Sequence, residues 1–336
     1  MNMKRWIALG GAVLLFVFAV GINTLSSIMS MNWQTMMEDS LAPAGGQMEQ
    51  VVEDGDARNR IALLRVDGII QDTGAASPLF AATGYNHQAF MEQLEMIRED
   101  NSVKGVVLYV NSPGGGVVES SDIHDKLVEI KEEKDIPVYV SMGGMAASGG
   151  YYISAPADKI FVHKETLTGS IGVIMESVNY GGFAEEHGID FVTIKSGEYK
   201  DIMSPTRDMT EEERNMLQTM LNDSYERFVD VIEAGRGMSE ADVKKWADGR
   251  IMNGGQAVEA KLADETGRLE DAIAGLREDH GLDKAQVFEY GMDAGFGSLF
   301  GVKMQSLFQG DLESRIIGQV LSDYNSPRMM YLYGEK

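Results

Sequence analysis

Two polar residues about fifty positions apart, a serine and a lysine, are the side chains best suited to covalent chemistry. Ser148 lies between Met145-Ala146-Ala147 and Gly149-Gly150, and Lys200 follows Ser196-Gly197-Glu198-Tyr199. A hydroxyl becomes a nucleophile only when a base removes its proton, and a neutral lysine amine is such a base. The pair therefore predicts hydrolysis through a covalent intermediate, without a histidine, a metal or a cofactor.

The segment around Ser148 has the composition of a turn that presents a catalytic serine between a strand and a helix. The apolar run from Val138 to Val140 precedes it, and small residues surround it. Small neighbours allow a strained turn to expose the hydroxyl. A helix that begins here would also offer a backbone N–H and a favourable dipole to a developing negative charge. Tight packing of a helix on a strand would explain the same small residues.

A second glycine-rich turn, Asn111-Ser112-Pro113-Gly114-Gly115-Gly116, follows the valine-rich run from Gly105 to Val110. Glycines permit left-handed backbone and a close approach to a substrate. The N–H groups of this turn could therefore form the other half of an oxyanion hole. A phosphate-binding loop is disfavoured, because no Gly-Lys-Ser/Thr follows and the G-x-G-x-x-G pattern is absent. A plain tight turn is the remaining interpretation.

Lys200 can serve as the base only if its surroundings keep the amine neutral, and the sequence does not show those surroundings. Ser170, in Thr168-Gly169-Ser170-Ile171-Gly172, carries a hydroxyl that could hold the amine in line. A Ser–His–Asp triad is the alternative, with His124 or His163 as the base. Neither histidine lies in a glycine-marked turn, which favours the lysine.

Composition argues against several other classes of protein. The chain has 336 residues, a formal net charge of −23 and no cysteine. Nucleic acid is an unsuitable partner, because its binding requires a basic face. Disulfides, thiolate nucleophiles and cysteine metal sites are impossible, and the five histidines are too scattered for a zinc site.

The N-terminus predicts a membrane anchor. Lys4 and Arg5 precede 17 apolar or glycine residues, Trp6 to Ile22, and no further charge occurs before Glu38. This length and basic flank predict a single transmembrane helix within residues 1–32, with the N-terminus in the cytoplasm and the rest of the chain outside. A cleaved signal peptide is the alternative, but no small-x-small site follows the apolar run. Residues 33–58 then form a flexible acidic linker.

Strand-like and helix-like segments alternate between residues 59 and 273. Thr210 and Glu213 predict a capping box that starts a long amphipathic helix ending near Gly235. The alternation predicts an α/β domain with a mainly parallel sheet and flanking helices. Residues 274–336 are expected to be a C-terminal tail of unknown role. The expected short strands include 60–66, 105–110, 138–140, 160–162, 172–175 and 191–194.

Four blocks of sequence, taken in order, resemble the signal peptide peptidase A family. These are membrane-anchored bacterial serine proteases with a Ser–Lys dyad and a ClpP/crotonase-like fold. The resemblance covers about residues 60 to 272 and departs from the family at Lys261, where a glycine is usual. The four blocks are Asn111-Ser112-Pro113-Gly114-Gly115, Met145-Ala146-Ala147-Ser148-Gly149-Gly150-Tyr151-Tyr152, Thr168-Gly169-Ser170-Ile171-Gly172-Val173 and Ser196-Gly197-Glu198-Tyr199-Lys200.

The resemblance implies a role for each site residue. Ser148 would be the nucleophile, Lys200 the general base and Ser170 the residue that orients the lysine, while Gly114 and Gly149 would form the oxyanion hole. It implies no cofactor and no metal. It also implies an extracytoplasmic, membrane-anchored endopeptidase that degrades remnant signal peptides and other hydrophobic peptides, as a ring-shaped homo-oligomer such as an octamer. The alternatives are a non-catalytic membrane scaffold or regulator of the same fold, and a crotonase-type acyl-CoA enzyme.

Overall fold

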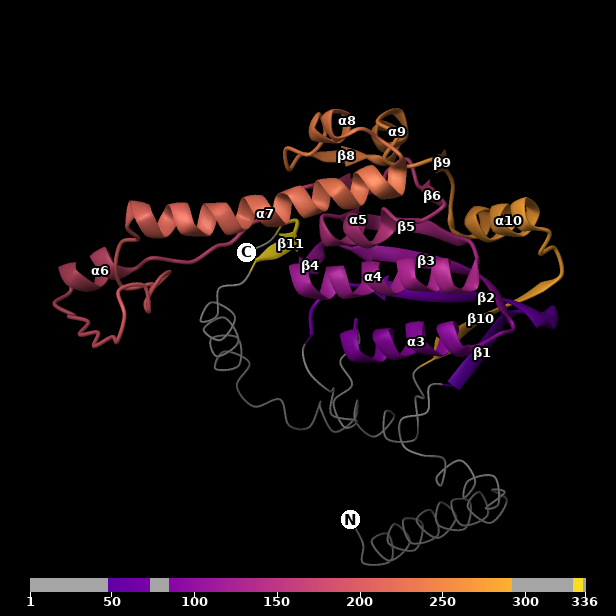
Figure 1. Cartoon of the computed structure of the whole chain (residues 1–336), viewed down its shortest axis with the longest axis horizontal. Coiled ribbons are helices and arrows are strands. Elements are labelled where there is room, and N and C mark those ends of the chain that lie inside the picture. Colours follow the sequence, from indigo (N-terminus) through magenta and orange to yellow (C-terminus); the bar gives the residue numbers. More distant parts are fainter. Residues whose placement is uncertain (1–47, 73–84, 292–328, 335–336) are drawn as a thin grey trace, which may run out of the picture. The chain divides into compact units, whose positions relative to one another are not determined.

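The computed structural model describes residues 48–72, 85–291 and 329–334 of the chain (Figure 1). Within these ranges no helix is both long and apolar enough to cross a membrane. The expected anchor, residues 1–32, lies outside the described residues, and so does the part of the expected linker before residue 48.

A nine-stranded sheet forms the centre of the fold. Seven strands follow the order β1-β10-β2-β3-β5-β6-β9, and the other two lie off this path, with β7 paired to β5 and β8 paired to β7. The pairings of β2 with β10 and β3, of β3 with β5, and of β5 with β6 are all parallel, whereas β7 and β8 pair antiparallel. The prediction of an α/β fold with a mainly parallel sheet is therefore confirmed. The strands are β1 (Met48–Glu53), β2 (Asp56–Asp67), β3 (Val103–Ser112), β5 (Val138–Ala147), β6 (Lys159–Val162), β7 (Leu167–Gly169), β8 (Ile251–Asn253), β9 (Glu265–Thr266) and β10 (Ala285–Gly291).

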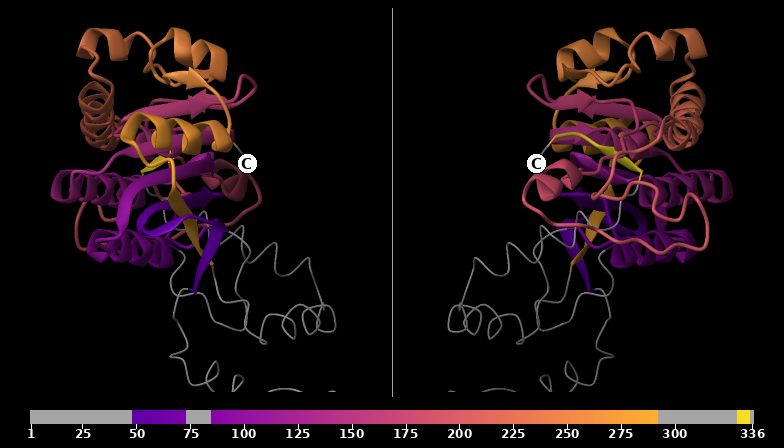
Figure 2. Two further views of the ribbon diagram at one scale, coloured as in Figure 1. Left: turned by 90° about the vertical axis from the view of Figure 1, so that its right-hand side faces the viewer. Right: turned by 90° about the vertical axis from the view of Figure 1, so that its left-hand side faces the viewer.

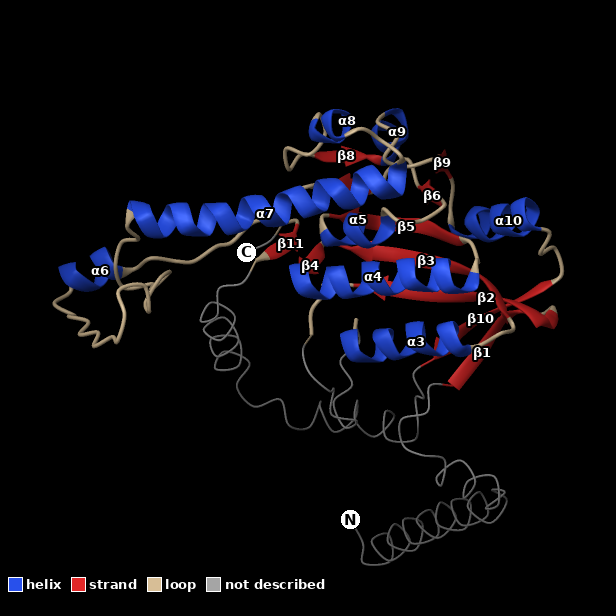
Figure 3. Cartoon of the chain, in the orientation of Figure 1, coloured by secondary structure: helices blue, strands red, loops and turns tan. Residues whose placement is uncertain are grey.

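Helices cover both faces of this sheet (Figures 2 and 3). Successive residues of a strand point to opposite faces. Ala62 and Leu64 of β2 accordingly pack with residues of α3, α4, α5 and α7, while Ile61 and Leu63 pack with residues of α10. The helices are α3 (His87–Glu99), α4 (Val117–Lys134), α5 (Gly149–Ser154), α6 (Gly181–Glu186), α7 (Glu211–Arg236), α8 (Glu240–Lys244), α9 (Gly254–Glu259) and α10 (Leu269–His280).

Helix α7 begins and ends as its sequence predicts. The Thr210 side chain accepts from the Glu213 N–H, and the Glu213 carboxylate accepts from the Thr210 N–H, which completes the capping box. Gly237, at a φ of 59°, ends the helix in the left-handed conformation. At 26 residues and about 1.5 Å of rise per residue, α7 is about 39 Å long. It packs on the core through Phe228, Val229 and Ile232 near its C-terminal end.

Residues 175–209, called the arm below, leave the sheet after β7 and lead into α7. Figure 1 shows α6, within the arm, beyond the carboxyl ends of the central strands and near the first turn of α7. The predicted strand at 191–194 is wrong, because this segment is irregular and exposed, with Ile194 96% exposed. At 172–175 the structure has an isolated bridge from Ile174 to Met330 in place of a strand. A strand-like apolar pattern does not produce a strand where no sheet edge is available to pair with it.

The ordered fold extends beyond the boundaries that composition indicates. Strand β1 and the start of β2 lie within the range expected to be linker, and β10 lies within the expected tail. Strand β10 pairs in parallel with β2 and buries Val287 and Phe288, so it is an integral part of the sheet. The last described strand, β11 (Met330–Leu332), pairs antiparallel with β4 (Gly114–Gly116) in a separate two-stranded sheet.

Candidate active site

Ser148 lies at the carboxyl end of β5 and caps the N-terminus of α5. Its φ of 54° and ψ of −117° are a strained conformation for an L-residue. The residue is 1% exposed, and its N–H donates to the Gly169 carbonyl at 2.8 Å, which fixes the turn. A Cβ on Gly150 would come within 2.8 Å of the Ser112 carbonyl oxygen, so the chain needs glycine there. The strained strand-to-helix turn predicted from the small residues is therefore present.

The two glycines expected to form an oxyanion hole lie side by side. Gly114 has a φ of 102°, and a Cβ on it would lie 2.6 Å from the Gly149 nitrogen. Gly149 opens α5, so its N–H belongs to the first turn, where N–H groups have no partner within the helix. The Gly114 N–H donates to Ser112 Oγ at 3.0 Å. An oxyanion beside Gly149 would therefore have to compete with the Ser112 hydroxyl for the Gly114 N–H.

The chain's own C-terminal strand occupies the groove beside these glycines. In β11, Leu332 pairs with Gly114 and Tyr331 with Gly115, and Met330 bridges to Ile174 on the other side. The Tyr331 ring is buried, and its hydroxyl donates to the Ser224 carbonyl of α7 at 2.9 Å. A Cβ on Gly114 would lie only 2.0 Å from the Tyr331 carbonyl oxygen. An extended peptide segment therefore fits against β4 with a carbonyl group close to the candidate oxyanion hole.

Ser170 lies next to the Ser148 turn. Strand β7 pairs with β5 so that Gly169 is opposite Ala147, and each strand continues into one of the two serines. Ser170 has a φ of 50°, is 9% exposed, and donates its N–H to the Arg250 carbonyl at 2.7 Å. It lines a hollow of about 380 Å³ that Ile174, Tyr225 and Leu332 also line. The hollow could accommodate a side chain of a bound peptide.

Lys200 is the predicted site residue that a single chain does not bring to Ser148. It is exposed on the arm, and among the described residues its amine makes no hydrogen bond or ion pair. The turn that carries it contacts the first turn of α7 through Tyr199 and Glu212. Strand β11, which pairs with β4 beside the Ser148 turn, contacts α7 through the Tyr331 hydroxyl and the Ser224 carbonyl. Glu212 and Ser224 are twelve residues apart, which is about 18 Å along the helix axis.

The histidines do not provide a substitute base. His124 is hydrogen-bonded to Asp125 at 2.8 Å and lies edge-on to the Tyr152 ring. His163 is exposed, and its Nδ1 accepts the Glu165 N–H. In the described parts of the chain, neither is hydrogen-bonded to Ser148, and no cluster of side chains could hold a metal ion.

Sequence reasoning missed the strand β11. Its residues lie far from β4 in the chain, and Met330-Tyr331-Leu332 is too short a run to indicate a pairing partner. The available signal was a short aromatic and apolar run close to the C-terminus, after a segment without clear periodicity.

The candidate site is thus a parallel strand that ends in a strained serine turn beside paired glycines. Residues 82–168 match the Clp protease family and residues 130–283 match peptidase family S49, which makes the chain a serine protease with a Clp protease-like fold. The chain belongs to the signal peptide peptidase A family of serine proteases, within family S49.

Three relatives illustrate the family. The chain is 41% identical to the Enterococcus faecium protein named "Putative signal peptide peptidase SppA", over 99% of both chains. It is 33% identical to Protease 4 of Haemophilus influenzae, over 68% of this chain and 36% of that protein. It is also 31% identical to capsid assembly protease C of Escherichia phage lambda, over 66% of this chain and 49% of that protein.

Proposed function

We propose that this serine protease is a membrane-anchored endopeptidase that uses Ser148 and Lys200 to degrade remnant signal peptides. The observation that carries the proposal is the left-handed Ser148 turn, which lies next to Gly114 and Gly149 in a groove that accepts an extended peptide. Family membership makes the chain a serine protease, and this turn is where the chain provides a suitably placed serine.

The mechanism needs one base and one anion-binding site. The neutral amine of Lys200 removes the Ser148 proton, and the serine oxygen attacks a peptide carbonyl to give a tetrahedral intermediate. The Gly149 N–H stabilises the oxyanion, assisted by the Gly114 N–H when that group exchanges its bond to Ser112. The protonated lysine then gives its proton to the leaving amine. Water releases the acyl group by the same steps, with Lys200 again as the base.

The groove selects extended peptides. Strand β11 shows that β4 can pair with an added antiparallel strand, and main-chain pairing of this kind is a common mode of peptide binding. The neighbouring hollow is lined by Ile174, Leu221 and Tyr225, which an apolar side chain could contact, and by polar residues that include Gln218, Asn222 and Asp248. Remnants of signal peptides are apolar peptides that can bind in an extended form. The predicted anchor at residues 1–32 would keep the enzyme at the membrane that holds them.

A second copy of the chain would complete the site. Lys200 is exposed on the arm, and the arm also exposes a concentration of apolar side chains. An apolar surface next to an unpartnered catalytic amine is what an interface between copies would bury. We infer that the arm of one protomer docks on its neighbour and brings Lys200 to the neighbour's Ser148. The most exposed of these apolar residues are Val178, Phe183, Ile189, Val192 and Ile194.

Mixing two inactive variants tests this proposal. Ser148→Ala and Lys200→Ala should each fail to cleave a fluorogenic apolar peptide, while both should fold normally. When the two are unfolded together and refolded as mixed oligomers, activity should return, because some interfaces then pair an intact serine with an intact lysine. Mass spectrometry with a peptide-like electrophile should place the acyl adduct on Ser148. Cleavage retained by Lys200→Ala would exclude the dyad, and mixtures without activity would exclude its sharing between copies.

A further inference from the structure

The residues on both sides of Lys200 are fastened to the first turn of α7. The Tyr199 hydroxyl donates to Glu212 Oε1 at 2.7 Å, and Asp201 is joined through Arg207 to Glu213. The backbone of the turn is closed by hydrogen bonds from the Lys200 N–H to the Gly197 carbonyl at 3.2 Å and from Ile202 to Tyr199 at 3.1 Å. Lys200 is therefore presented by a fixed turn although its own side chain is exposed.

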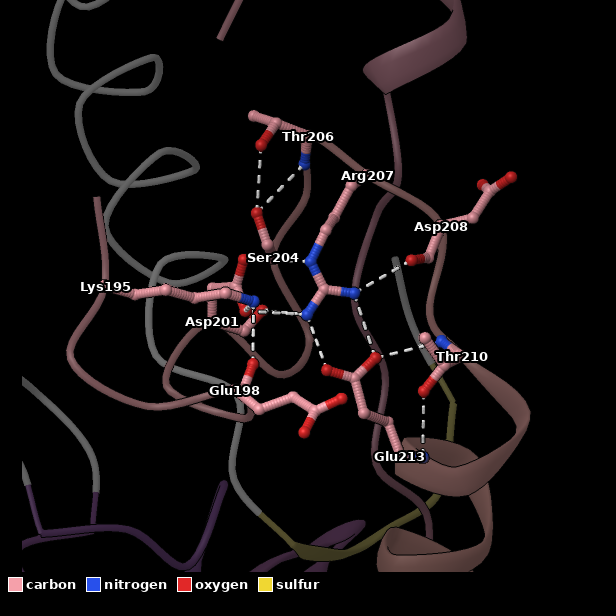
Figure 4. A network of polar contacts seen from close by, with 9 residues as sticks. All are labelled: Lys195, Glu198, Asp201, Ser204, Thr206, Arg207, Asp208, Thr210 and Glu213. Carbon is pink, nitrogen blue, oxygen red and sulfur yellow. Dashed lines mark hydrogen bonds and ion pairs between the residues drawn. The ribbon is translucent and has the colours of Figure 1, made fainter. Parts of the chain in front are cut away.

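Arg207 is the centre of this arrangement (Figure 4). Its Nε and Nη2 donate to the two Asp201 carboxylate oxygens at 2.9 and 2.7 Å. Its Nη1 and Nη2 donate to the two Glu213 carboxylate oxygens at 2.9 and 2.5 Å. Additional bonds reach the Asp208 and Asp201 carbonyls. A planar guanidinium can hold two carboxylates in this way, whereas a lysine ammonium cannot match both pairs of oxygens.

Glu213 connects the guanidinium to the helix itself. Its side chain is 2% exposed, and the same carboxylate accepts the Thr210 N–H in the capping box. The guanidinium of Arg207 and the capping hydrogen bonds lower the pKa of Glu213 to about 2. The carboxylate is therefore ionised over the whole range in which a protease of this kind would work. The arm turn is consequently tied to the helix by a charge that persists at all these pH values.

The network also holds the carboxylate of the residue that follows Lys200. A carboxylate brought close to the Lys200 amine would favour the charged ammonium over the neutral base, and Asp201 is the residue next in sequence. Arg207 and Lys195, the latter at 2.6 Å, both pair with Asp201, and together they lower the pKa of its carboxyl strongly. The charged and titratable groups around this turn are Lys195, Glu198, Tyr199, Asp201, Arg207, Asp208, Glu212 and Glu213.

We infer that Arg207 is a positioning residue for the dyad: it holds the Lys200 turn on the first turn of α7 and keeps Asp201 paired away from the catalytic amine. This inference rests on the proposed function of Lys200 as the base. A misplacement of about 1 Å costs a catalytic group roughly 100-fold in rate. The expected effect of loosening the turn is therefore large even though Arg207 touches no substrate.

The test compares Arg207→Ala, Arg207→Lys and Lys200→Ala with Arg98→Ala in the full-length protein in detergent. Arg98 is a matched control, because it also bonds acidic partners, Glu95 and Glu133, but lies on α3. Arg207→Ala should lower kcat by about 10- to 100-fold on a fluorogenic apolar peptide, with KM changed less than threefold. Its rise of kcat with pH should begin at higher pH, because Asp201 has lost its main partner. Arg207→Lys should restore the wild-type pH profile more fully than the wild-type kcat. A lysine restores the positive charge, but it cannot bond both carboxylates as the planar guanidinium does.

Each outcome separates the inference from the function on which it rests. Wild-type kcat and pH profile in Arg207→Ala, with Lys200→Ala inactive, would overturn the inference and leave the dyad intact. Activity in Lys200→Ala would instead overturn the dyad. If Arg207→Ala fails to fold or assemble by light scattering, Asp201→Asn decides. That variant keeps Arg207 on Glu213, and it should lower kcat while its pH profile stays as in the wild type or begins at lower pH. An unchanged kcat in a folded Asp201→Asn would refute the positioning role.

Discussion

The two halves of the proposed dyad are held by different forces. Ser148 is buried in a turn determined by strand pairing, close packing and glycines whose replacement would cause collisions. Lys200 is exposed on the arm and is placed by ion pairs and hydrogen bonds to the first turn of α7. Packing would hold the proposed nucleophile in place within a single chain. Charge pairing would hold the proposed base only while the ion pairs persist, and a neighbouring copy would have to receive it.

This difference has a physical advantage for a protease. In our proposal, the strained serine is held in place within each chain, whereas the base arrives only with assembly. An isolated chain would then carry a nucleophile without its activating amine and would be inactive. Each half should therefore respond to a different perturbation.

The largest effects should come from the dyad itself. Ser148→Ala and Lys200→Ala should each lower kcat/KM by on the order of 10⁴-fold or more. The lysine has no nucleophile to activate without the serine, and the serine has no base without the lysine. The melting temperature should change little in either variant. Removing the Ser148 hydroxyl leaves the packed turn unchanged, and Lys200 makes no hydrogen bond or ion pair through its amine among the residues described. A melting temperature lowered by many degrees in either variant would contradict the separation of chemistry from folding.

Glycine substitutions should distinguish the packed half from the arm. A Cβ at Gly114 would lie 2.0 Å from the Tyr331 carbonyl oxygen, and the φ of 102° disfavours any side chain. Gly114→Ala should cost about 2 kcal/mol or more in the free energy of unfolding and about 100-fold in kcat. Gly182→Ala, in α6, is the control, because nothing lies within 4 Å of its added Cβ. Equal losses in both variants, measured by denaturant unfolding and peptide cleavage, would show that the two halves are equally constrained.

Salt should affect the arm more than the Ser148 turn. The Arg207 side chain is 30% exposed, so its ion pairs are accessible to screening. The Debye length falls from about 10 Å at 0.1 M salt to about 3 Å at 1 M. We expect kcat to fall about two- to fivefold over this range, with little change in melting temperature. The kcat of Arg207→Ala should depend less on salt, and an equal dependence in that variant would assign the effect to another site.

The pH dependence of stability should identify the window in which the arm is anchored. The pKa of Glu213 is lowered to about 2 by Arg207, so its contribution is complete above about pH 4.5 and is lost as pH falls towards 2. The pKa of Tyr199 is raised to about 12, mainly by its hydrogen bond to Glu212. That contribution is complete below about pH 10 and is lost as pH rises towards 12.

The measurement for this prediction is the difference in melting temperature between wild type and Arg207→Ala. The difference should be constant between about pH 5 and 9 and should shrink below that window. Over the same range the arm stays anchored, so a rise of activity with pH would reflect the base and not the loss of the network. A difference that grows on acidification would contradict the assigned pairing.

Local chemistry explains what could be predicted from the sequence. The Ser148 turn and the Thr210–Glu213 capping box depend on residues close together in the chain, and both are present. The parallel sheet follows from the alternation of apolar strands and amphipathic helices, which is also a local pattern. The glycine-rich turns indicate two halves of an oxyanion hole, but only the family resemblance assigns it to Gly114 and Gly149, which about 35 residues separate.

The features that could not be predicted depend on distant or external partners. The pairing of β11 with β4 joins segments more than 200 residues apart, and three residues cannot specify such a partner. The arm carries strand-like apolar runs, such as Phe191 to Ile194, but they lie exposed in a single chain. The surroundings of Lys200 depend on another protomer in our proposal. No periodicity within one chain contains that information.

The smallest prediction separates strain that serves catalysis from strain that does not. Lys261, like Ser148, has a positive φ, here 62°, but it follows α9 in a helix-ending turn. Its N–H donates to Val258, and the Leu262 N–H donates to Ala257, which is the pattern that favours glycine at this position. Lys261→Gly should therefore stabilise the fold by about 0.5 to 1 kcal/mol, since relief of the left-handed strain exceeds the entropy that glycine costs. Denaturant unfolding should detect this gain, with kcat unchanged. The corresponding Ser148→Gly variant would relax its turn equally well but should have no activity, because there the strain serves to present a reactive group.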